Sequence, residues 1–270
     1  MIALSDLVIP PRVLIYGEPS TGKTFLVGKL AAAGMNILLL DADRGAMTLR
    51  QFPKEAQARI TYVNIADLPG NYRAAKSLWN LLKASATAPL KVCEKHHTYS
   101  CTSCKEGGTV FTKESLHASN TIVVLDTWTA VAESASGEAN KELDFGEKSS
   151  WDNFGKLKNQ LTPLKIGLKN FPLPLLVLAH SIDIEEGDAD KRRLVKIAPM
   201  GGSKDFAQSF AGGFDHVLYT YFSTGGTHKV AGSQAQYRLS YARSRDGRDF
   251  ATDPAAALAA VYSEYFSDKR

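Results

Sequence analysis

The sequence lacks an apolar run long enough to cross a membrane. No stretch approaches about 18 uninterrupted apolar residues, the length typical of a membrane-spanning helix. Its first residues, MIALSD, also lack the basic-then-apolar order of a signal peptide. We therefore expect a cytoplasmic protein with no membrane partner.

Cysteine is scarce, and the charge is small. The three cysteines among 270 residues all lie within residues 93–104. This clustering argues against a disulfide framework and favours metal ligands in a reducing compartment. The formal net charge of +4 is compatible with an anionic partner but does not by itself indicate one.

A phosphate-binding loop is present near the N-terminus. Residues 17–24 read GEPSTGKT and match the pattern G-x-x-x-x-G-K-[ST] at every fixed position. A strand-like run precedes the loop at residues 13–16, and a helical pattern follows at residues 25–33. Backbone N–H groups and a helix N-terminus then converge on one anion. We predict a nucleoside triphosphate site formed by Gly17, Glu18, Pro19, Ser20, Thr21, Gly22, Lys23, Thr24 and Phe25.

Two residues of this loop have specific roles in the predicted site. Lys23 reaches the β- and γ-phosphates as a point charge, and the hydroxyl of Thr24 coordinates Mg²⁺. The alternative is a glycine-rich turn that matches the pattern by chance. The strand and helix predicted on either side favour the nucleotide site.

Two later apolar runs end in acidic residues. Residues 36–41 read NILLLD and lead into Asp43, whereas residues 121–127 read TIVVLDT and have the Walker B form. We predict that Asp126 holds Mg²⁺, directly or through water, and that Asp41 or Asp43 orients the water that attacks the γ-phosphate. A solvated strand end, or a turn capped by Asp41, is the alternative for the acid pair.

A third apolar run, residues 175–181, ends in His180 and Ser181. We expect this strand to lie beside the strand of the phosphate loop, where His180 would sense the γ-phosphate. The alternative is a histidine that forms only structural hydrogen bonds.

Basic residues cluster at two places after this strand. The first cluster is predicted to bind the phosphate backbone of a nucleic acid, with the bound nucleotide controlling this contact. It consists of Lys191, Arg192, Arg193 and Lys196. The alternative for this cluster is a solvated hairpin. Arg243 and Arg245 are candidates for an arginine finger that reaches the γ-phosphate of a neighbouring subunit, with solvated turn charges as the alternative.

The remaining patterns predict the other elements of the fold. A strand is expected at residues 59–64, a helix at 72–86 and a loop at 133–150. A helix should follow at residues 151–170, kinked or broken near Pro163, and another at 203–211, capped by Ser203. Three antiparallel strands at residues 214–222, 228–231 and 236–243 and a last helix at 254–266 complete the prediction.

Residues 90–113 form an insert rich in metal-ligand side chains. Four ligands at this spacing close a tetrahedral Cys₃His zinc site. The ligands are Cys93, Cys101, Cys104 and one of His96 and His97, between which the sequence does not choose. A closed four-ligand site leaves no position for a catalytic water, so its predicted role is structural.

Taken together, the phosphate loop, the acid pair, Asp126 and His180 resemble the RecA-like ATPase core, and more narrowly the phage nucleotide-binding proteins that include RecA-like single-strand annealing ATPases. The resemblance implies one α/β domain over residues 1–270. Its mostly parallel central sheet would be flanked by helices, with antiparallel C-terminal strands and the small insert. Asp43 occupies the place of the family's water-polarising glutamate, one methylene shorter, and phage relatives have a histidine at the position of His180.

The resemblance also implies a function. The protein would be an ATPase that uses ATP and Mg²⁺, is stimulated by single-stranded DNA and assembles as a ring or filament in phage-type recombination. It would then act in the cytoplasm of a bacterial host, with a single-strand-binding protein or a helicase as a further candidate partner. One alternative is a helicase loader or packaging-type motor whose zinc insert binds a protein, and another is a nucleotide-dependent binding module with negligible turnover.

Overall fold

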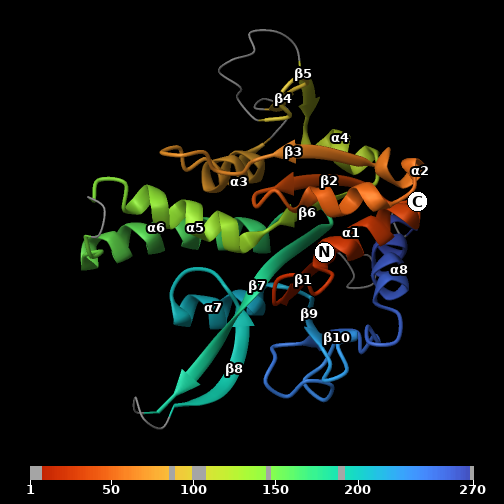
Figure 1. The fold of residues 1–270 in the computed structure, drawn as a ribbon. Coiled ribbons are helices and arrows are strands. Elements are labelled where there is room, and N and C mark those ends of the chain that lie inside the picture. Colours follow the sequence, from red (N-terminus) through yellow and green to blue (C-terminus); the bar gives the residue numbers. More distant parts are fainter. Residues whose placement is uncertain (1–7, 85–88, 99–107, 144–146, 188–191, 268–270) are drawn as a thin grey trace, which may run out of the picture.

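A twisted, mostly parallel sheet forms the centre of the chain. The computed structural model describes residues 8–84, 89–98, 108–143, 147–187 and 192–267 (Figure 1). The strands of the nine-stranded sheet are β1 Arg12–Gly17, β2 Asn36–Asp41, β3 Ile60–Asn64, β6 Thr121–Asp126, β7 Leu175–Glu186, β8 Arg193–Pro199, β9 His216–Phe222, β10 His228–Ala231 and β11 Arg243–Ser244. Their order along the main path is β10-β9-β1-β7-β6-β2-β3, with β8 paired to β7 and β11 paired to β9.

The strand directions agree with the predicted fold class. All pairs from β9 across to β3 are parallel, whereas β8, β10 and β11 pair antiparallel with their neighbours. The strand predicted at residues 236–243 is wrong, because only Arg243 and Ser244 pair with β9. The residues before them form turns, in which the side chain of Gln236 accepts hydrogen bonds from the backbone of Gly232 and Ser233.

Helices cover both faces of the sheet. Their bounds are α1 Lys23–Ala32, α2 Lys54–Gln57, α3 Ala74–Lys83, α4 Lys113–Ala118, α5 Trp128–Ala139, α6 Trp151–Lys169, α7 Lys204–Phe210 and α8 Pro254–Ser267. Leu14 and Tyr16 of β1 pack in one core with α3, α5, α6 and α7, whereas Val13 and Ile15 pack in the other with α1 and α8. None of the helices in the described ranges combines the length and apolarity that a bilayer crossing requires.

The loop predicted at residues 133–150 is wrong over its first part, because α5 continues to Ala139. The small residues that suggest a loop are small because α5 packs closely against α3 and the segment that leads into it. Ser134 is fully buried and donates a hydrogen bond to Asp67, and a Cβ at Gly137 would lie 2.1 Å from the ring of Tyr72.

Pro163 lies inside α6 without ending it. Its missing N–H would have bonded the carbonyl of Asn159, which is on the exposed side of the helix, so water can satisfy that carbonyl instead. Ser203 caps α7 as predicted, accepting a hydrogen bond from the backbone of Phe206.

The parallel strands bring the predicted site residues to one edge of the sheet. Gly17 pairs with His180 on one side and with Thr220 on the other. Asp41 pairs with Asp126. The expectation that the strand of His180 lies beside that of the phosphate loop is therefore confirmed, and this edge is where open parallel sheets bind their ligands.

Candidate nucleotide site

The phosphate loop joins the end of β1 to the start of α1. Gly22 precedes α1 with a left-handed φ of 85°, a conformation that glycine adopts without strain. A Cβ at Gly17 would lie 2.1 Å from the carbonyl oxygen of Thr220, so only glycine fits between β1 and β9 at this point. The spacing of glycines in the motif thus has a direct structural cause.

A second threonine holds the loop from the neighbouring strand. The hydroxyl of Thr21 donates to the carbonyl oxygen of Glu18 over 2.7 Å and lies 2.7 Å from the hydroxyl of Thr220. Both threonines are buried. The sequence analysis missed Thr220, since it lies about 200 residues from the loop and belongs to no motif.

Lys23 lies at the centre of the loop. Its ammonium donates to the carbonyl oxygens of Gly17 and Glu18 over 2.9 and 2.7 Å. Burial lowers the pKa of Lys23 to about 8, against the opposing effect of the nearby Asp126 and Asp43 carboxylates. Phosphate oxygens at this point would supply the negative charge that keeps the ammonium protonated.

Thr24 and Asp126 form the predicted magnesium site. The hydroxyl of Thr24 donates to Asp126 Oδ2 over 2.8 Å. Burial, with a contribution from the charge of Asp43, raises the pKa of Asp126 to about 7. A hydroxyl and a carboxylate are the hard oxygen ligands that Mg²⁺ prefers, so these two residues fit the ion.

The two acids after β2 have different surroundings. Asp41 is almost fully buried and accepts hydrogen bonds from the backbone of Gly45 and Ala46, so it caps the following turn. Asp43 lines the nucleotide cavity, and its Oδ2 lies 3.8 Å from Nε2 of His180. Burial, together with Lys23, lowers the pKa of His180, which favours its neutral form. Asp43 is therefore the acid that faces the site.

A cavity of about 790 Å³ joins these residues, which is large enough for a nucleoside triphosphate. The predicted residues from Pro19 to Phe25 all line it, together with Asp43, Asp126 and His180. Its further lining comes from elements that the sequence analysis did not connect with the site, namely His228, Lys229 and Val230 of β10 and Ala251, Thr252 and Pro254 near the start of α8.

Comparison with known proteins gives the family. A family model described as an AAA domain matches residues 9–245. The chain belongs to this AAA domain family. The match and the phosphate loop identify a P-loop AAA domain. No curated protein matches the sequence.

Two solved structures are among those similar to this chain. A prototypical ATPase from the type III secretion system of pathogenic bacteria is 14% identical, with a TM-score of 0.47 over 93% of this chain and 63% of that one. The RadB recombinase is 14% identical, with a TM-score of 0.38 over 83% of this chain and 81% of that one. The AAA domain thus spans less than two thirds of the secretion ATPase.

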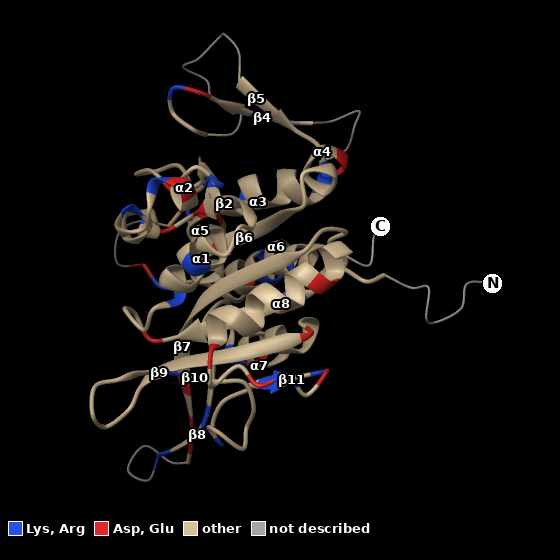
Figure 2. Cartoon of the chain, turned by 90° about the vertical axis from the view of Figure 1, so that its right-hand side faces the viewer, with Lys and Arg blue, Asp and Glu red and all other residues tan. Residues whose placement is uncertain are grey.

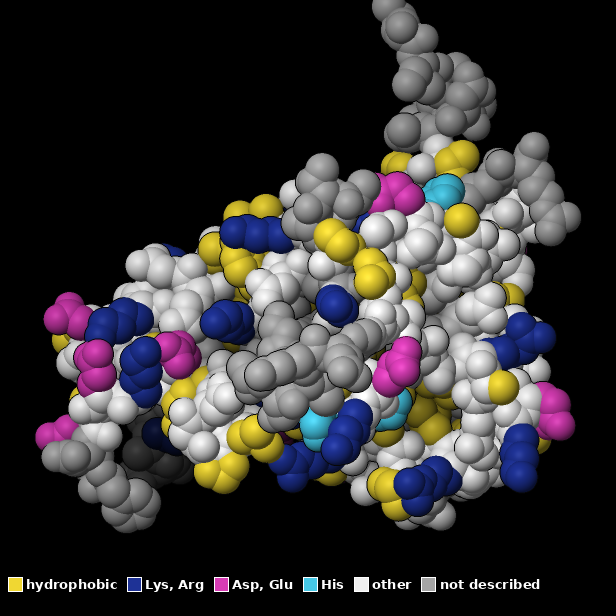
Figure 3. All heavy atoms as spheres, turned by 90° about the horizontal axis from the view of Figure 1, so that it is seen from above, with side chains coloured by type: hydrophobic (Ala, Val, Ile, Leu, Met, Phe, Trp, Pro, Cys, Tyr) yellow, Lys and Arg dark blue, Asp and Glu magenta, His cyan; other side chains and the backbone are white. Residues whose placement is uncertain are grey.

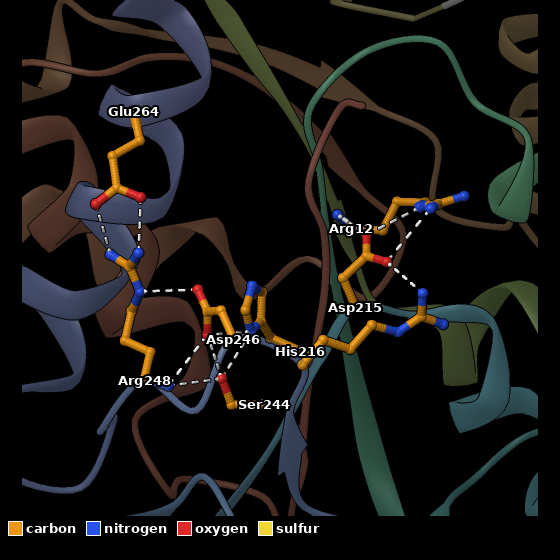
Figure 4. Close-up of polar contacts among 8 residues, drawn as sticks. Arg12, Asp215, His216, Ser244, Asp246, Arg248 and Glu264 are labelled. Carbon is orange, nitrogen blue, oxygen red and sulfur yellow. Dashed lines mark hydrogen bonds and ion pairs between the residues drawn. The ribbon is translucent and has the colours of Figure 1, made fainter. Parts of the chain in front are cut away.

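The two arginine-finger candidates lie at the other end of the strands from the nucleotide cavity. Arg243 pairs with Val217 near the start of β9, and its Nη2 donates to carbonyl oxygens of the segment after α7. Arg245 lies 3.3 Å from Asp215, the partner of Arg12 in the polar network of Figure 4. Within one chain neither arginine faces the cavity, and a contact with a neighbouring subunit stays a prediction.

The basic cluster lies on a hairpin of β7 and β8 that projects from the body (Figure 1). Arg192 and Arg193 are exposed on it, whereas Lys191 lies outside the described residues. Lys196 is nearer the body, where its ammonium donates to the carbonyl of Arg238 and lies 5.2 Å from the ring centroid of Tyr241.

The insert forms a second, two-stranded sheet, β4 Leu90–Cys93 with β5 Gly108–Phe111. It projects beyond the β3 edge in Figures 1 and 2, attached by a hydrogen bond from the backbone of Asn64 to His97. Cys101 and Cys104 lie outside the described residues. Within the described ranges no cluster of three metal-ligand side chains occurs, and the zinc site stays a prediction.

Proposed function

We propose that this AAA domain hydrolyses ATP and uses the nucleotide to control its binding of single-stranded DNA. The observation that carries the proposal is the path of β7. This strand pairs with the phosphate-loop strand up to His180 and then continues, without interruption, into the projecting basic hairpin. A change at the nucleotide therefore has a direct route to that hairpin.

Hydrolysis would use the residues around the cavity. Lys23 would bind the β- and γ-phosphates, and Thr24 and Asp126 would hold Mg²⁺, which would supply positive charge next to the phosphates. Asp43 orients the attacking water, and His180, held neutral, senses the γ-phosphate as a hydrogen-bond partner.

Two kinds of exposed side chain support single-stranded DNA as the ligand. Arg192 and Arg193 supply positive charge on the hairpin. Trp151 at the start of α6 is 91% exposed, and its ring centroid lies 6.2 Å from that of the half-exposed Phe154. Basic and aromatic side chains together bind single strands, because the bases stack on rings while cations contact phosphates.

Charge alone does not select the hairpin. Exposed Asp183, Glu185 and Glu186 lie on β7 beside its arginines, and the face seen from above in Figure 3 also mixes side chains of both charge signs. We place the DNA at the hairpin because β7 connects it to the phosphate-loop strand, and extend the proposal to a ring or filament acting in phage-type recombination or annealing. In such an assembly Arg245 would contact the nucleotide of a neighbour.

We also propose that the insert binds one zinc ion. The backbone N–H of His96 donates to Sγ of Cys93 over 3.2 Å, the kind of contact that stabilises a thiolate ligand. Elemental analysis of purified protein should give one zinc per chain, and a metal-free protein that stays folded would contradict the proposal. A helicase loader is the second candidate function, because the projecting insert is also suited to contacting a protein.

Binding of a fluorescent oligothymidine by anisotropy tests the DNA proposal. We expect tighter binding with a non-hydrolysable ATP analogue than with ADP, and about tenfold or more weaker binding in Arg192→Ala/Arg193→Ala, with a salt slope lower by about two. The matched control removes two exposed charges elsewhere, in Lys54→Ala/Arg59→Ala. Equal binding by both double variants, or no binding by the wild type, would reject the hairpin as the DNA site.

A further inference from the structure

His180 lies at the boundary between the central sheet and the hairpin. The pairing of β7 with β6 ends at Leu178, and its pairing with β1 ends at His180. From Ser181 onward β7 pairs only with β8. The backbone of His180 thus requires partners from outside the sheet on the side where β6 has ended.

Thr129, in the first turn of α5, supplies one of these partners. Its hydroxyl oxygen accepts the backbone N–H of His180 over 2.9 Å and donates to the carbonyl oxygen of Met200 over 3.1 Å. Met200 in turn donates its N–H to the carbonyl oxygen of His180 over 2.7 Å. One buried hydroxyl therefore joins the sensor residue to the segment that follows the hairpin.

Helix α5 does not require the hydroxyl of Thr129 as a cap. Thr127 is the capping residue, since its side chain accepts a hydrogen bond from the backbone of Ala130. Both hydrogen bonds of Thr129 instead cross to other elements.

A second contact joins the same two segments. Trp128 stacks on Phe210 of α7 with ring centroids 4.3 Å apart, and a Cβ at Gly201 would lie 2.3 Å from Nε1 of Trp128. The start of α5, two residues after the predicted Mg²⁺ ligand Asp126, is therefore packed against the segment that follows β8 and against α7.

We propose that Thr129 is a positioning residue that couples the nucleotide site to the β7–β8 hairpin. It holds the backbone of His180 and of Met200 together, so that a shift of His180 moves β7 and β8 as one unit. This inference rests on the proposed role of His180 as the γ-phosphate sensor, but it does not depend on what the hairpin binds.

The test compares hydrogen exchange of the hairpin amides in ADP and in a non-hydrolysable ATP analogue with Mg²⁺, using the full chain without DNA. Thr129→Val keeps the shape and removes the hydroxyl, whereas Thr129→Ser keeps the hydroxyl. We expect the wild type and Thr129→Ser to show a nucleotide-dependent difference. Thr129→Val removes both hydrogen bonds of the hydroxyl, and one net hydrogen bond contributes a factor of about five. The difference should therefore fall by about fivefold or more, while ADP affinity stays within about twofold.

The coupling role is overturned if Thr129→Val keeps the wild-type difference, if Thr129→Ser loses it, or if the wild type shows none. Should Thr129→Val fail to fold, Thr129→Ala removes the same hydroxyl without the branched apolar replacement. Failure of the DNA proposal is separate, because a hairpin that responds to nucleotide but does not bind oligothymidine rejects only that proposal.

Discussion

The tight contact between β1 and β9 at Gly17 makes a quantitative prediction. In Gly17→Ala the new Cβ would lie 2.1 Å from the carbonyl oxygen and 2.3 Å from Oγ1 of Thr220. An ordinary contact begins at 3.4 Å, so one strand must move by about 1.3 Å against backbone that cannot rotate away. Overpacking of this kind costs about 1–3 kcal/mol.

Thermal unfolding measures this cost directly. For a chain of this size each kcal/mol lowers Tm by about 2–4 °C, so we expect Tm to fall by roughly 2–12 °C in Gly17→Ala. Nucleotide at 100 times its Kd should stabilise the wild type by about 2.7 kcal/mol and so raise its Tm. Gly17→Ala should lose this rise, because its phosphate loop is displaced.

Gly155→Ala is the matched control. Gly155 lies inside α6, and a Cβ there meets no atom within 4 Å among the described residues. Alanine favours a helix interior by about 1 kcal/mol, so this variant should have a raised Tm and an unchanged response to nucleotide. A Gly17→Ala protein with the wild-type Tm and the wild-type response would refute the argument.

Three further predictions concern the site and the opposite end of the sheet. Asp43→Asn should lower the ATP turnover rate by about 100-fold or more with nearly unchanged nucleotide affinity, because it removes the water-orienting carboxylate; a rate within a few-fold of wild type would exclude that role. Arg243→Ala should destabilise the fold by about 2 kcal/mol in denaturant titration, since it leaves the part-buried carbonyls of Ala211 and Phe214 without this donor. Arg245→Ala, which removes an exposed guanidinium from its ion pair with Asp215, should cost under about 1 kcal/mol, and equal losses would contradict this contrast. Burial lowers the pKa of His216. Below the ordinary histidine pKa of about 6.5, the unfolded chain therefore takes up a proton that the folded chain does not, and the free energy of unfolding should fall from pH 7 to pH 5. The fall should be less steep in His216→Gln, whereas parallel profiles would show that His216 does not contribute.

The sequence was sufficient to predict the elements that carry strong local patterns. The parallel strands ending at Gly17, Asp41 and Asp126 are fully buried apolar runs, and their carboxyl ends meet at one edge because the sheet is parallel. The phosphate loop was recognisable because its glycines and Lys23 occur at fixed spacing. Most residues that these features predicted for the site line one cavity in the structure.

Other parts of the site depend on contacts between distant segments. Thr220 supports the loop from a strand that carries no motif, and His228 and Lys229 reach the cavity only because β10 folds back against β9. Ser134 and Gly137 suggested a loop by composition, although the close packing of α5 on α3 requires small residues at these positions. At Ser134 and Gly137, tertiary packing outweighs the local secondary-structure propensity.

The acid pair is another case in which the local sequence pattern was not sufficient. The local pattern of apolar run and acids does not distinguish Asp41 from Asp43, and only the resemblance to the RecA-like core favoured Asp43. In the structure Asp41 accepts hydrogen bonds from the backbone of Gly45 and Ala46, whereas Asp43 accepts one from Gly45 and lines the cavity. The path of the backbone after β2 thus places Asp43, and not Asp41, at the cavity.

Steady-state ATP hydrolysis in the presence of Mg²⁺, with and without single-stranded DNA, tests the central claim most directly. Lys23→Ala serves as the blank, because it removes the cation that binds the β- and γ-phosphates. We predict turnover by the wild type, a further rise on addition of single-stranded DNA, and no turnover above background in Lys23→Ala. A wild-type rate equal to that of Lys23→Ala under both conditions would contradict the claim that this site hydrolyses ATP.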